Sequence, residues 1–368
     1  MSTIKVNRIE NTSTTDGGVS IDVDGHVTID GQQLPTAGPL SNRNLIINGA
    51  MQVAQRGTTG TQTQYGGYPT CDRWRAQLDN ASQATFTKET SGGPAGFPNF
   101  FKWNVDSADA SVAVASNVYL QQRLEGFDLQ RLGYGTSAAK PLTISFYVKG
   151  SRTGTYVLEL HNINSSRHVG QTYTIDAADT WEYKTITFPA DTTGTFNDDN
   201  DESLRIKWWL QAGTNFTSGT LPTSWAAQSN VNSAVGQSIN LHDTAGSNWN
   251  ITGVQLEVGS KSTPFEHESY SQTLAKCQRY YFKMGPTFSM HGHTLTTGAD
   301  PYKRNYFPFP VEMRDTPDCD GTSTISGGGV FSTGNPVYAG TTTFAIIATD
   351  GTAASFSTTS AFDADAEL

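Results

Sequence analysis

Apolar and polar residues alternate through much of the chain between residues 45 and 265. In Leu142–Lys149, the apolar side chains Leu142, Ile144, Phe146 and Val148 occupy every second position. Successive side chains of a strand point to opposite faces of a sheet, so this pattern predicts a strand with one buried face. The same period recurs in 100–105, 118–124, 156–161, 204–211 and 251–258. Such runs without helical periodicity predict an all-β protein built on a two-sheet antiparallel sandwich.

One run breaks this alternation. In Trp181–Phe188 the apolar phase changes between Tyr183 and Ile186. An extra residue in a strand shifts the phase of its side chains by one position. The pattern therefore predicts a β-bulge in this strand.

The N-terminal forty residues carry three short β patterns, Thr3–Ile9, Val19–Val23 and His26–Ile29, separated by Asp-Gly turn signals. A β unit of this size cannot bury a core alone, so it should pack against copies of itself or against a partner. The segment Leu34–Pro39 is typical of a linker.

Helical spacing occurs once after the sandwich. Leu274, Cys277 and Tyr281 fall on one face of a predicted helix, with Ser269 or Ser271 as its N-cap. The chain then returns to β character. These patterns divide it into an N-terminal β segment (1–40), the sandwich (41–268), a helical connector (269–283) and a C-terminal β domain (284–368).

Charge and composition exclude several classes of protein. The formal net charge is −10 and no basic cluster stands out along the sequence, so we expect no nucleic-acid partner. We expect no membrane insertion, because no apolar run approaches the length of a membrane span, and no signal peptide precedes the first strand. Three widely spaced cysteines, Cys71, Cys277 and Cys319, predict buried free thiols.

An ordered set of short motifs resembles a widespread family of bacteriophage tail-fibre or virion appendage proteins. The motifs are Asn44–Gly49, Asp72–Trp74, Gln122–Gly126, Leu142–Lys149, Trp249–Gly259, Thr263–Glu266, Cys277–Tyr281 and Phe309–Arg314 with Pro317. The opening Ser2–Asn7 is similar to the start of such appendage proteins. The resemblance implies a jelly-roll core similar to carbohydrate-binding modules, a homotrimer, and a place in the virion.

The residues of these motifs have simple structural interpretations. Val254, Leu256 and Val258 alternate with polar residues and predict a closing strand, while Asp72-Arg-Trp74 is interpreted as a buried aromatic residue with a flanking ion pair. The sequence carries no recognisable catalytic motif. We therefore predict that the protein is not an enzyme, although a carboxylate pair formed in space is not visible in a sequence.

A sugar-binding site needs an exposed aromatic ring surrounded by hydrogen-bonding groups. In Leu204–Gln211, the predicted strand places Arg205, Lys207, Trp209 and Gln211 on the face opposite the core. We predict a glycan platform there, with the alternative that a neighbouring chain or loop covers this face. Trp181 and Tyr183 are the second candidates for contacts with a sugar.

Two segments are candidate metal sites. The acidic run Asp198, Asp199, Asp201 and Glu202 offers oxygen ligands for Ca²⁺, with a solvated loop as the alternative, and its spacing departs from the EF-hand pattern. His291 and His293 would place two imidazoles on one face of a strand, and three copies in a trimer would surround an axis. No cofactor is predicted.

The functional expectation combines these points. The N-terminal segment is expected to dock on other virion proteins, and the sandwich and C-terminal domain to bind a host-surface polysaccharide. The protein would be synthesised in the host cytoplasm and carried in the virion. The alternatives are an architectural virion protein without receptor contact, and a polysaccharide depolymerase.

Overall fold

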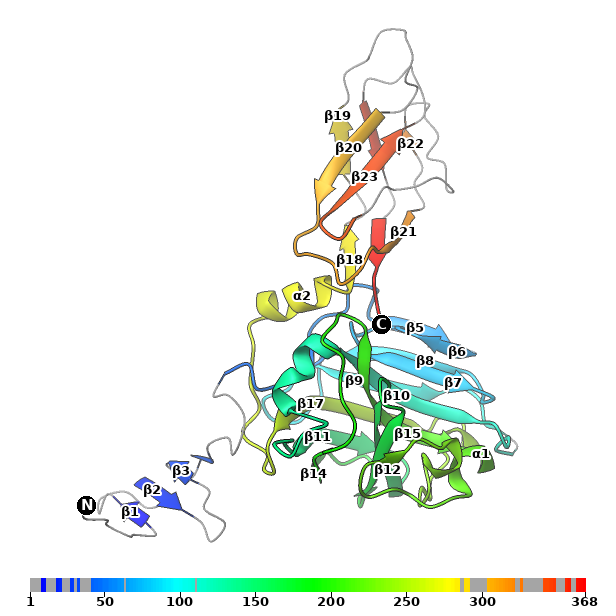
Figure 1. Ribbon diagram of the computed structural model, residues 1–368. Helices are drawn as coiled ribbons and strands as arrows, with labels where there is room; N and C mark the ends of the chain where they lie inside the picture. The colour runs from blue at the N-terminus through cyan, green and yellow to red at the C-terminus, as the bar shows by residue number, and fades with distance from the viewer. Residues whose placement is uncertain are drawn as a thin grey trace, which may run out of the picture.

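The computed structural model describes residues 8–10, 18–21, 27–29, 32–33, 41–62, 64–109, 111–284, 288–291, 303–321, 325–326, 340–348, 355–358 and 362–368. Two antiparallel sheets form the central body (Figure 1). The seven-stranded sheet has the order β16 (Ala226–Ala227), β13 (Arg167–Ile175), β12 (Gly154–Asn162), β15 (Glu202–Ala212), β10 (Asn117–Glu125), β7 (Arg75–Asp79) and β6 (Tyr65–Gly67). The six-stranded sheet has the order β14 (Glu182–Phe188), β11 (Leu142–Gly150), β17 (Asn248–Val258), β9 (Phe100–Val105), β8 (Ala84–Glu89) and β5 (Thr59–Gln62).

Strands that are neighbours in these sheets are often distant in sequence, which is the arrangement of a jelly-roll sandwich. The predicted all-β sandwich is therefore confirmed. Its core lies between the two sheets, where the alternating apolar residues of β11, β12, β15 and β17 meet. Four fully buried tryptophans fill much of this space: Trp74, Trp103, Trp208 and Trp249.

The predicted bulge in Trp181–Phe188 is wrong. Strand β14 pairs with β11 in unbroken register from Leu142 opposite Phe188 to Val148 opposite Glu182. Because β14 is the edge of its sheet, its side chains are only partly covered, and Tyr183 is 49% exposed. The change of apolar phase therefore reflects an aromatic residue on the outer face.

The helix after the sandwich is α2 (Tyr270–Gln278), and Ser269 is its N-cap. The Ser269 side chain accepts from the backbone of Gln272, and the Gln272 side chain accepts from the backbone of Ser269, which is a capping box. Cys277 lies on the buried face, as predicted, whereas Tyr281 already belongs to the next strand. The other helices are short: α1 (Thr214–Thr217), η1 (Gly126–Leu132), η2 (Asn230–Asn232) and η3 (Leu241–Asp243).

Smaller sheets lie at both ends of the chain. Near the N-terminus, β1 (Arg8–Glu10), β2 (Gly18–Ile21), β3 (Val27–Ile29) and β4 (Gln32–Gln33) form an antiparallel sheet. Figure 1 shows β1, β2 and β3 apart from the sandwich, and the C-terminal strands as a narrow extension above it. Those strands pair as β18 (Tyr281–Met284), β25 (Phe362–Asp365) and β21 (Asp318–Gly321); β19 (Phe288–His291), β24 (Ser355–Thr358) and β22 (Ile325–Ser326); and β20 (Lys303–Pro308) with β23 (Thr343–Ala348).

The prediction of free thiols can be checked residue by residue. Cys71 and Cys277 are buried free thiols, and Cys319 is a free thiol that is partly exposed. Among the described residues, no helix has the length and apolar character needed to cross a membrane.

Candidate binding site

The predicted platform on β15 is directed as expected but is not exposed. Trp208 belongs to the core between the sheets, and Trp209 lies on the outer face of the seven-stranded sheet. Trp209, however, is only 1% exposed, and Lys207 and Gln211 are buried with it. The expected open platform at Trp209 is therefore wrong, and the alternative of a covering loop describes this face.

The covering segment runs from residue 213 to residue 234 and contains α1 and η2. Phe216 packs against the Trp209 ring at 5.4 Å between centroids, and Leu221 lies against the same cluster. Both residues come from a loop whose sequence shows no strand pattern. They exclude water from Trp209, so this ring serves packing.

Under this cover lies a buried charged group, the Glu159 carboxylate. It accepts hydrogen bonds from Trp209 Nε1 at 2.9 Å and Lys207 Nζ at 3.2 Å, and His168 Nδ1 lies 2.9 Å from it. Burial alone would raise the pKa of Glu159, but the Lys207 charge and the His168 hydrogen bond outweigh burial and lower this pKa to about 2. Lys207 is thus committed to an internal ion pair.

Trp181 and Tyr183 lie at the edge of the other sheet, Tyr183 within the edge strand β14 and Trp181 directly before it. Trp181 is partly exposed and stands immediately before the strand, and Tyr183 is 49% exposed. The indole Nε1 of Trp181 donates to Gly92 O at 2.8 Å, which fixes the ring orientation. Tyr183 packs against Tyr147 at 5.0 Å between ring centroids. These two residues retain the exposure that a sugar contact requires.

Polar residues from adjacent strands continue outward from Trp181. Asn250 on β17 is directly opposite Lys149 on β11 and Lys102 on β9, so the two lysines flank one amide. The Lys149 ammonium lies 5.0 Å from the Trp181 ring centroid and 5.3 Å from that of Phe100. We call Trp181, Tyr183, Lys149, Asn250 and Lys102 the Trp181 surface.

A hollow of about 300 Å³ opens on this surface. It is lined by Glu89, Phe100, Lys102, Lys149, Asp179, Asn248 and Asn250. Lys102 is 3.8 Å from the Glu89 carboxylate, whereas Lys149 has no ion-pair partner among the described residues. The hollow thus combines an apolar wall, amides and both signs of charge, which is a lining able to bind a polyhydroxylated ligand.

The acidic loop does not form the candidate cation site, and the alternative of a solvated loop describes its exposed carboxylates. Asp198 and Asp201 are exposed and Asp199 is partly exposed, while the Glu202 carboxylate is held by Arg205 at 2.6 Å and Arg123 at 3.4 Å. In the part of the chain that the structure describes, no group of three or more His, Cys, Asp or Glu side chains is placed to hold a metal ion. His293 lies outside the described residues, and His291 is described only as the last residue of β19.

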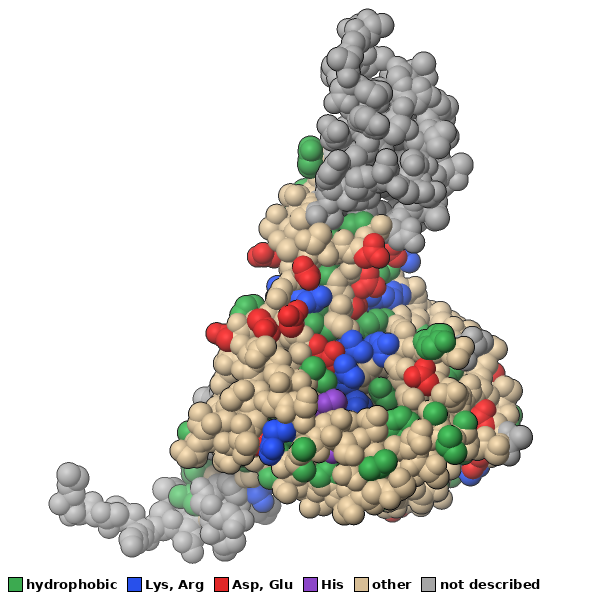
Figure 2. All heavy atoms as spheres, turned by 45° about the vertical axis from the view of Figure 1, so that its right-hand side comes forward, with side chains coloured by type: hydrophobic (Ala, Val, Ile, Leu, Met, Phe, Trp, Pro, Cys, Tyr) green, Lys and Arg blue, Asp and Glu red, His purple; other side chains and the backbone are tan. Residues whose placement is uncertain are grey.

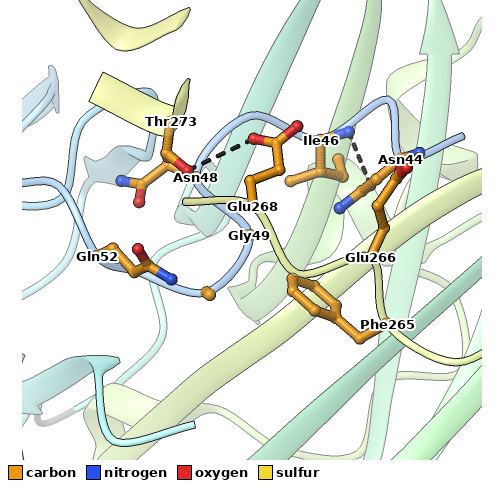
Figure 3. A pocket seen from close by; sticks show the side chains of 10 residues that line it. Asn44, Ile46, Asn48, Gly49, Gln52, Phe265, Glu266, Glu268 and Thr273 are labelled. Carbon is orange, nitrogen blue, oxygen red and sulfur yellow. Dashed lines mark hydrogen bonds between the residues drawn. The ribbon is translucent and has the colours of Figure 1, made fainter. Parts of the chain in front are cut away.

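Several of the ordered sequence motifs meet where the sandwich begins and ends. Figure 3 shows Glu266, Phe265 and Asn44 at a small cavity of about 20 Å³. The Glu266 carboxylate accepts the backbone N–H groups of Asn42, Arg43 and Asn44 at 2.7 to 2.9 Å. The Asn44 side chain in turn accepts from Leu256 N at 3.0 Å. These residues fasten the first segment to β17 and have a structural role.

A second group of motif residues joins the sandwich to α2 and the C-terminal strands. Glu125 at the end of β10 is buried and accepts from Arg279 at 2.9 and 2.7 Å and from the Tyr280 hydroxyl. Trp74 is buried as interpreted, but Arg73 pairs with Glu367 of the C-terminal segment, while Asp72 accepts from Gln55. These motif residues therefore connect the sandwich to α2 and to the C-terminal strands.

Sequence reasoning missed Lys149, Lys102 and Asn250 as site residues. Each sits at an ordinary polar position of an alternating strand, and they become neighbours only through the register of β11, β17 and β9. The one signal in the sequence was the aromatic residue Tyr183 in the wrong phase of its strand.

No protein-family model and no curated protein matches the chain. The solved structures that match include an arabinose-bound GH51 α-L-arabinofuranosidase, 12% identical over 59% of this chain and 26% of that one, with a TM-score of 0.32. The enzymatically active domain of tailspike protein 4 of bacteriophage CBA120 is 11% identical over 58% of this chain and 21% of that one, with a TM-score of 0.29. A family 11 carbohydrate-binding module of Clostridium thermocellum is 14% identical over 57% of this chain and 98% of that one, with a TM-score of 0.26. The chain thus spans about a quarter of the first two proteins.

Proposed function

We propose that this protein is a bacteriophage tail-fibre or appendage subunit that binds a host-surface polysaccharide through the Trp181 surface. The observation that carries the proposal is that the exposed aromatic residues Trp181 and Tyr183 lie next to a polar hollow on the neighbouring strands of the same sheet. Sugar rings present apolar C–H faces and many hydroxyls, so they need both kinds of contact. The Trp181 surface offers both.

The charges of this surface favour binding over chemistry. Lys149 and Lys102 are donors, Asn248 supplies an amide, and the carboxylates of Glu89 and Asp179 accept along the lining of the hollow, while Asn250 is buried beside them. Hydroxyl groups are donors and acceptors at once, so a polysaccharide can pair with each of these groups. On this basis we propose that the protein acts as a binding subunit and not as an enzyme.

The place in the virion follows from the resemblance of the ordered motifs. On that basis we propose that the N-terminal β segment docks on other virion proteins and that the subunit assembles as a homotrimer. The strands β1 to β4 have two to four residues each, which is too short for a sheet that is stable by itself. A partner would supply the missing contacts. Docking without any receptor contact is the alternative function.

The test is a glycan array screened with the full-length protein and with Trp181→Ala. We expect the unaltered protein to bind a subset of bacterial surface glycans and Trp181→Ala to lose about tenfold or more in affinity for them, because the ring provides the apolar contact. Tyr270→Ala is the matched control, since Tyr270 is a 56% exposed aromatic residue on α2.

The melting temperature of each variant separates lost contact from lost folding. A folded Trp181→Ala protein with the binding profile of the unaltered chain would refute the Trp181 surface as the site. A full-length protein that binds no glycan would favour the architectural alternative.

A further inference from the structure

A second group of polar side chains lies on the outer face of the seven-stranded sheet, opposite to the face that carries the Trp181 surface. Arg123, Arg205 and His161 are directly opposite one another on β10, β15 and β12. In the neighbouring row, Gln121 is opposite Arg75 on β7. We call Arg75, Gln121, Arg123, Arg205 and His161 the arginine row. On this side of the molecule, Figure 2 shows Lys and Arg side chains gathered near the middle of the face, with histidine beside them.

Several polar atoms of the arginine row lack partners. Gln121 is fully buried, and neither its amide nitrogen nor its amide oxygen makes a hydrogen bond within the described part of the chain. The same holds for Arg123 Nε and His161 Nδ1. Buried polar groups are nearly always paired, because an unpaired group loses its hydration without compensation. Three such residues leave unused hydrogen-bond donors and acceptors along this face.

The charges of the row are not balanced. Glu202 is the carboxylate shared by Arg205 and Arg123, at 2.6 and 3.4 Å. Arg123 also donates to Leu368 O, and Arg75 donates to the uncharged Gln77 Oε1. Burial, together with the like charge of Arg123, lowers the pKa of Arg75. Glu159 also lies close enough to act on the charge of Arg205, so among the described residues Arg75 is the guanidinium of the row that has no ion-pair partner.

The position of Arg75 depends on Gly66 in the edge strand β6. A Cβ atom on Gly66 would clash with the Arg75 guanidinium, so the glycine leaves room for this side chain to lie across the strand. The clash would be with the end of a flexible side chain and not with backbone. A Gly66→Ala substitution should therefore displace the guanidinium while leaving its charge and the sheet in place.

We propose that the arginine row is a second binding site that takes a carboxylate-bearing sugar. A guanidinium presents parallel N–H groups that match a carboxylate, and Arg75 is the guanidinium without an acidic partner. This site is independent of the Trp181 surface, because the two lie on different sheets.

The test uses isothermal titration calorimetry of the full-length protein with an oligogalacturonate and with its methyl ester, which has the same sugar backbone without the charge. We expect the acid to bind, the ester to bind about tenfold more weakly or worse, and added salt to weaken the binding of the acid. Arg75→Gln and Gly66→Ala should both weaken the binding of the acid. Arg152→Gln removes the same charge from a partly exposed position and should leave the binding unchanged.

Three results would overturn the proposal: no binding of the oligogalacturonate, equal binding of acid and ester, or Arg75→Gln binding as tightly as the unaltered protein. Trp181→Ala separates the two sites. This variant should keep its affinity for the oligogalacturonate. A loss of that affinity would show that the acidic sugar binds at the Trp181 surface instead.

Discussion

The buried ring of His242 couples the stability of the sandwich to pH. Its Nε2 accepts from the Trp103 indole at 3.0 Å, and its Nδ1 lies 3.0 Å from Ser82 Oγ, so the ring is neutral with its proton on Nδ1. Burial lowers the pKa of His242 to about 4, whereas an unfolded histidine titrates near 6.5. The unfolded chain therefore takes up the proton first, and stability is lost as the pH falls from about 6.5 towards 4.

We predict that this histidine alone costs about 1 kcal/mol of unfolding free energy between pH 6.5 and 5.5. Denaturant titrations at both pH values should show a smaller loss for His242→Gln than for the unaltered protein. His267→Gln removes an exposed imidazole, so this variant should lose as much unfolding free energy between the two pH values as the unaltered protein does. Equal losses of unfolding free energy in all three proteins would contradict the assignment of this pH dependence to His242.

At this scale the sequence predicted which way a side chain points but not what covers it. The alternation on β15 correctly assigned Trp208 to the core and Trp209 to the outer face. The burial of Trp209 depends on Phe216, whose loop carries no periodic pattern. Whether an outward side chain is exposed depends on the segments that pack over it. The pattern of the strand itself therefore could not predict that Trp209 is buried and Tyr183 is exposed.

Among the elements, the contact between the end of β10 and the two residues Arg279 and Tyr280, which connect α2 to β18, holds the C-terminal strands to the sandwich. Glu125 is 2% exposed and is bound by both Arg279 and Tyr280. The Arg279 side chain is 34% exposed, so part of its charge is compensated by solvent. Replacing the carboxylate by an amide leaves Arg279 and Tyr280 with one neutral acceptor in place of two charged oxygens.

We predict that Glu125→Gln lowers the free energy of unfolding by about 2 kcal/mol. Glu312→Gln, at an exposed position, should lower it by less than about 0.5 kcal/mol. A double-mutant cycle with Arg279→Gln measures the coupling by denaturant unfolding. Independent effects of the two substitutions would show that this ion pair does not hold the elements together.

Element boundaries followed closely from periodicity, while pairing did not. The alternation in 142–149 and 204–211 matches β11 and β15 within a few residues. The order of strands within each sheet brings together segments far apart in sequence, such as β9 and β17. The wrong prediction of a bulge in β14 also comes from not knowing the strand order. Both neighbours of a central strand cover its side chains and favour strict alternation, whereas an edge strand has one neighbour and can carry an aromatic residue on its outer face.

For the whole molecule, the sandwich presents two different outer faces. The six-stranded sheet carries the Trp181 surface, and the seven-stranded sheet carries the arginine row on one side of a loop-covered aromatic cluster. The motifs that resemble phage appendage proteins lie mainly where the parts of the molecule connect, and they also contain Lys149 and Asn250 of the Trp181 surface and Arg123 of the arginine row.

The central claim is that a glycan contacts Trp181 and not Trp209. The most direct measurement is an NMR titration that follows the indole N–H signals of the seven tryptophans while a glycan selected on the array is added. We predict that the Trp181 signal shifts and that the Trp209 signal, whose N–H is bound to Glu159, stays in place. A glycan that shifts Trp209 alone, or binds without moving Trp181, would contradict the claim.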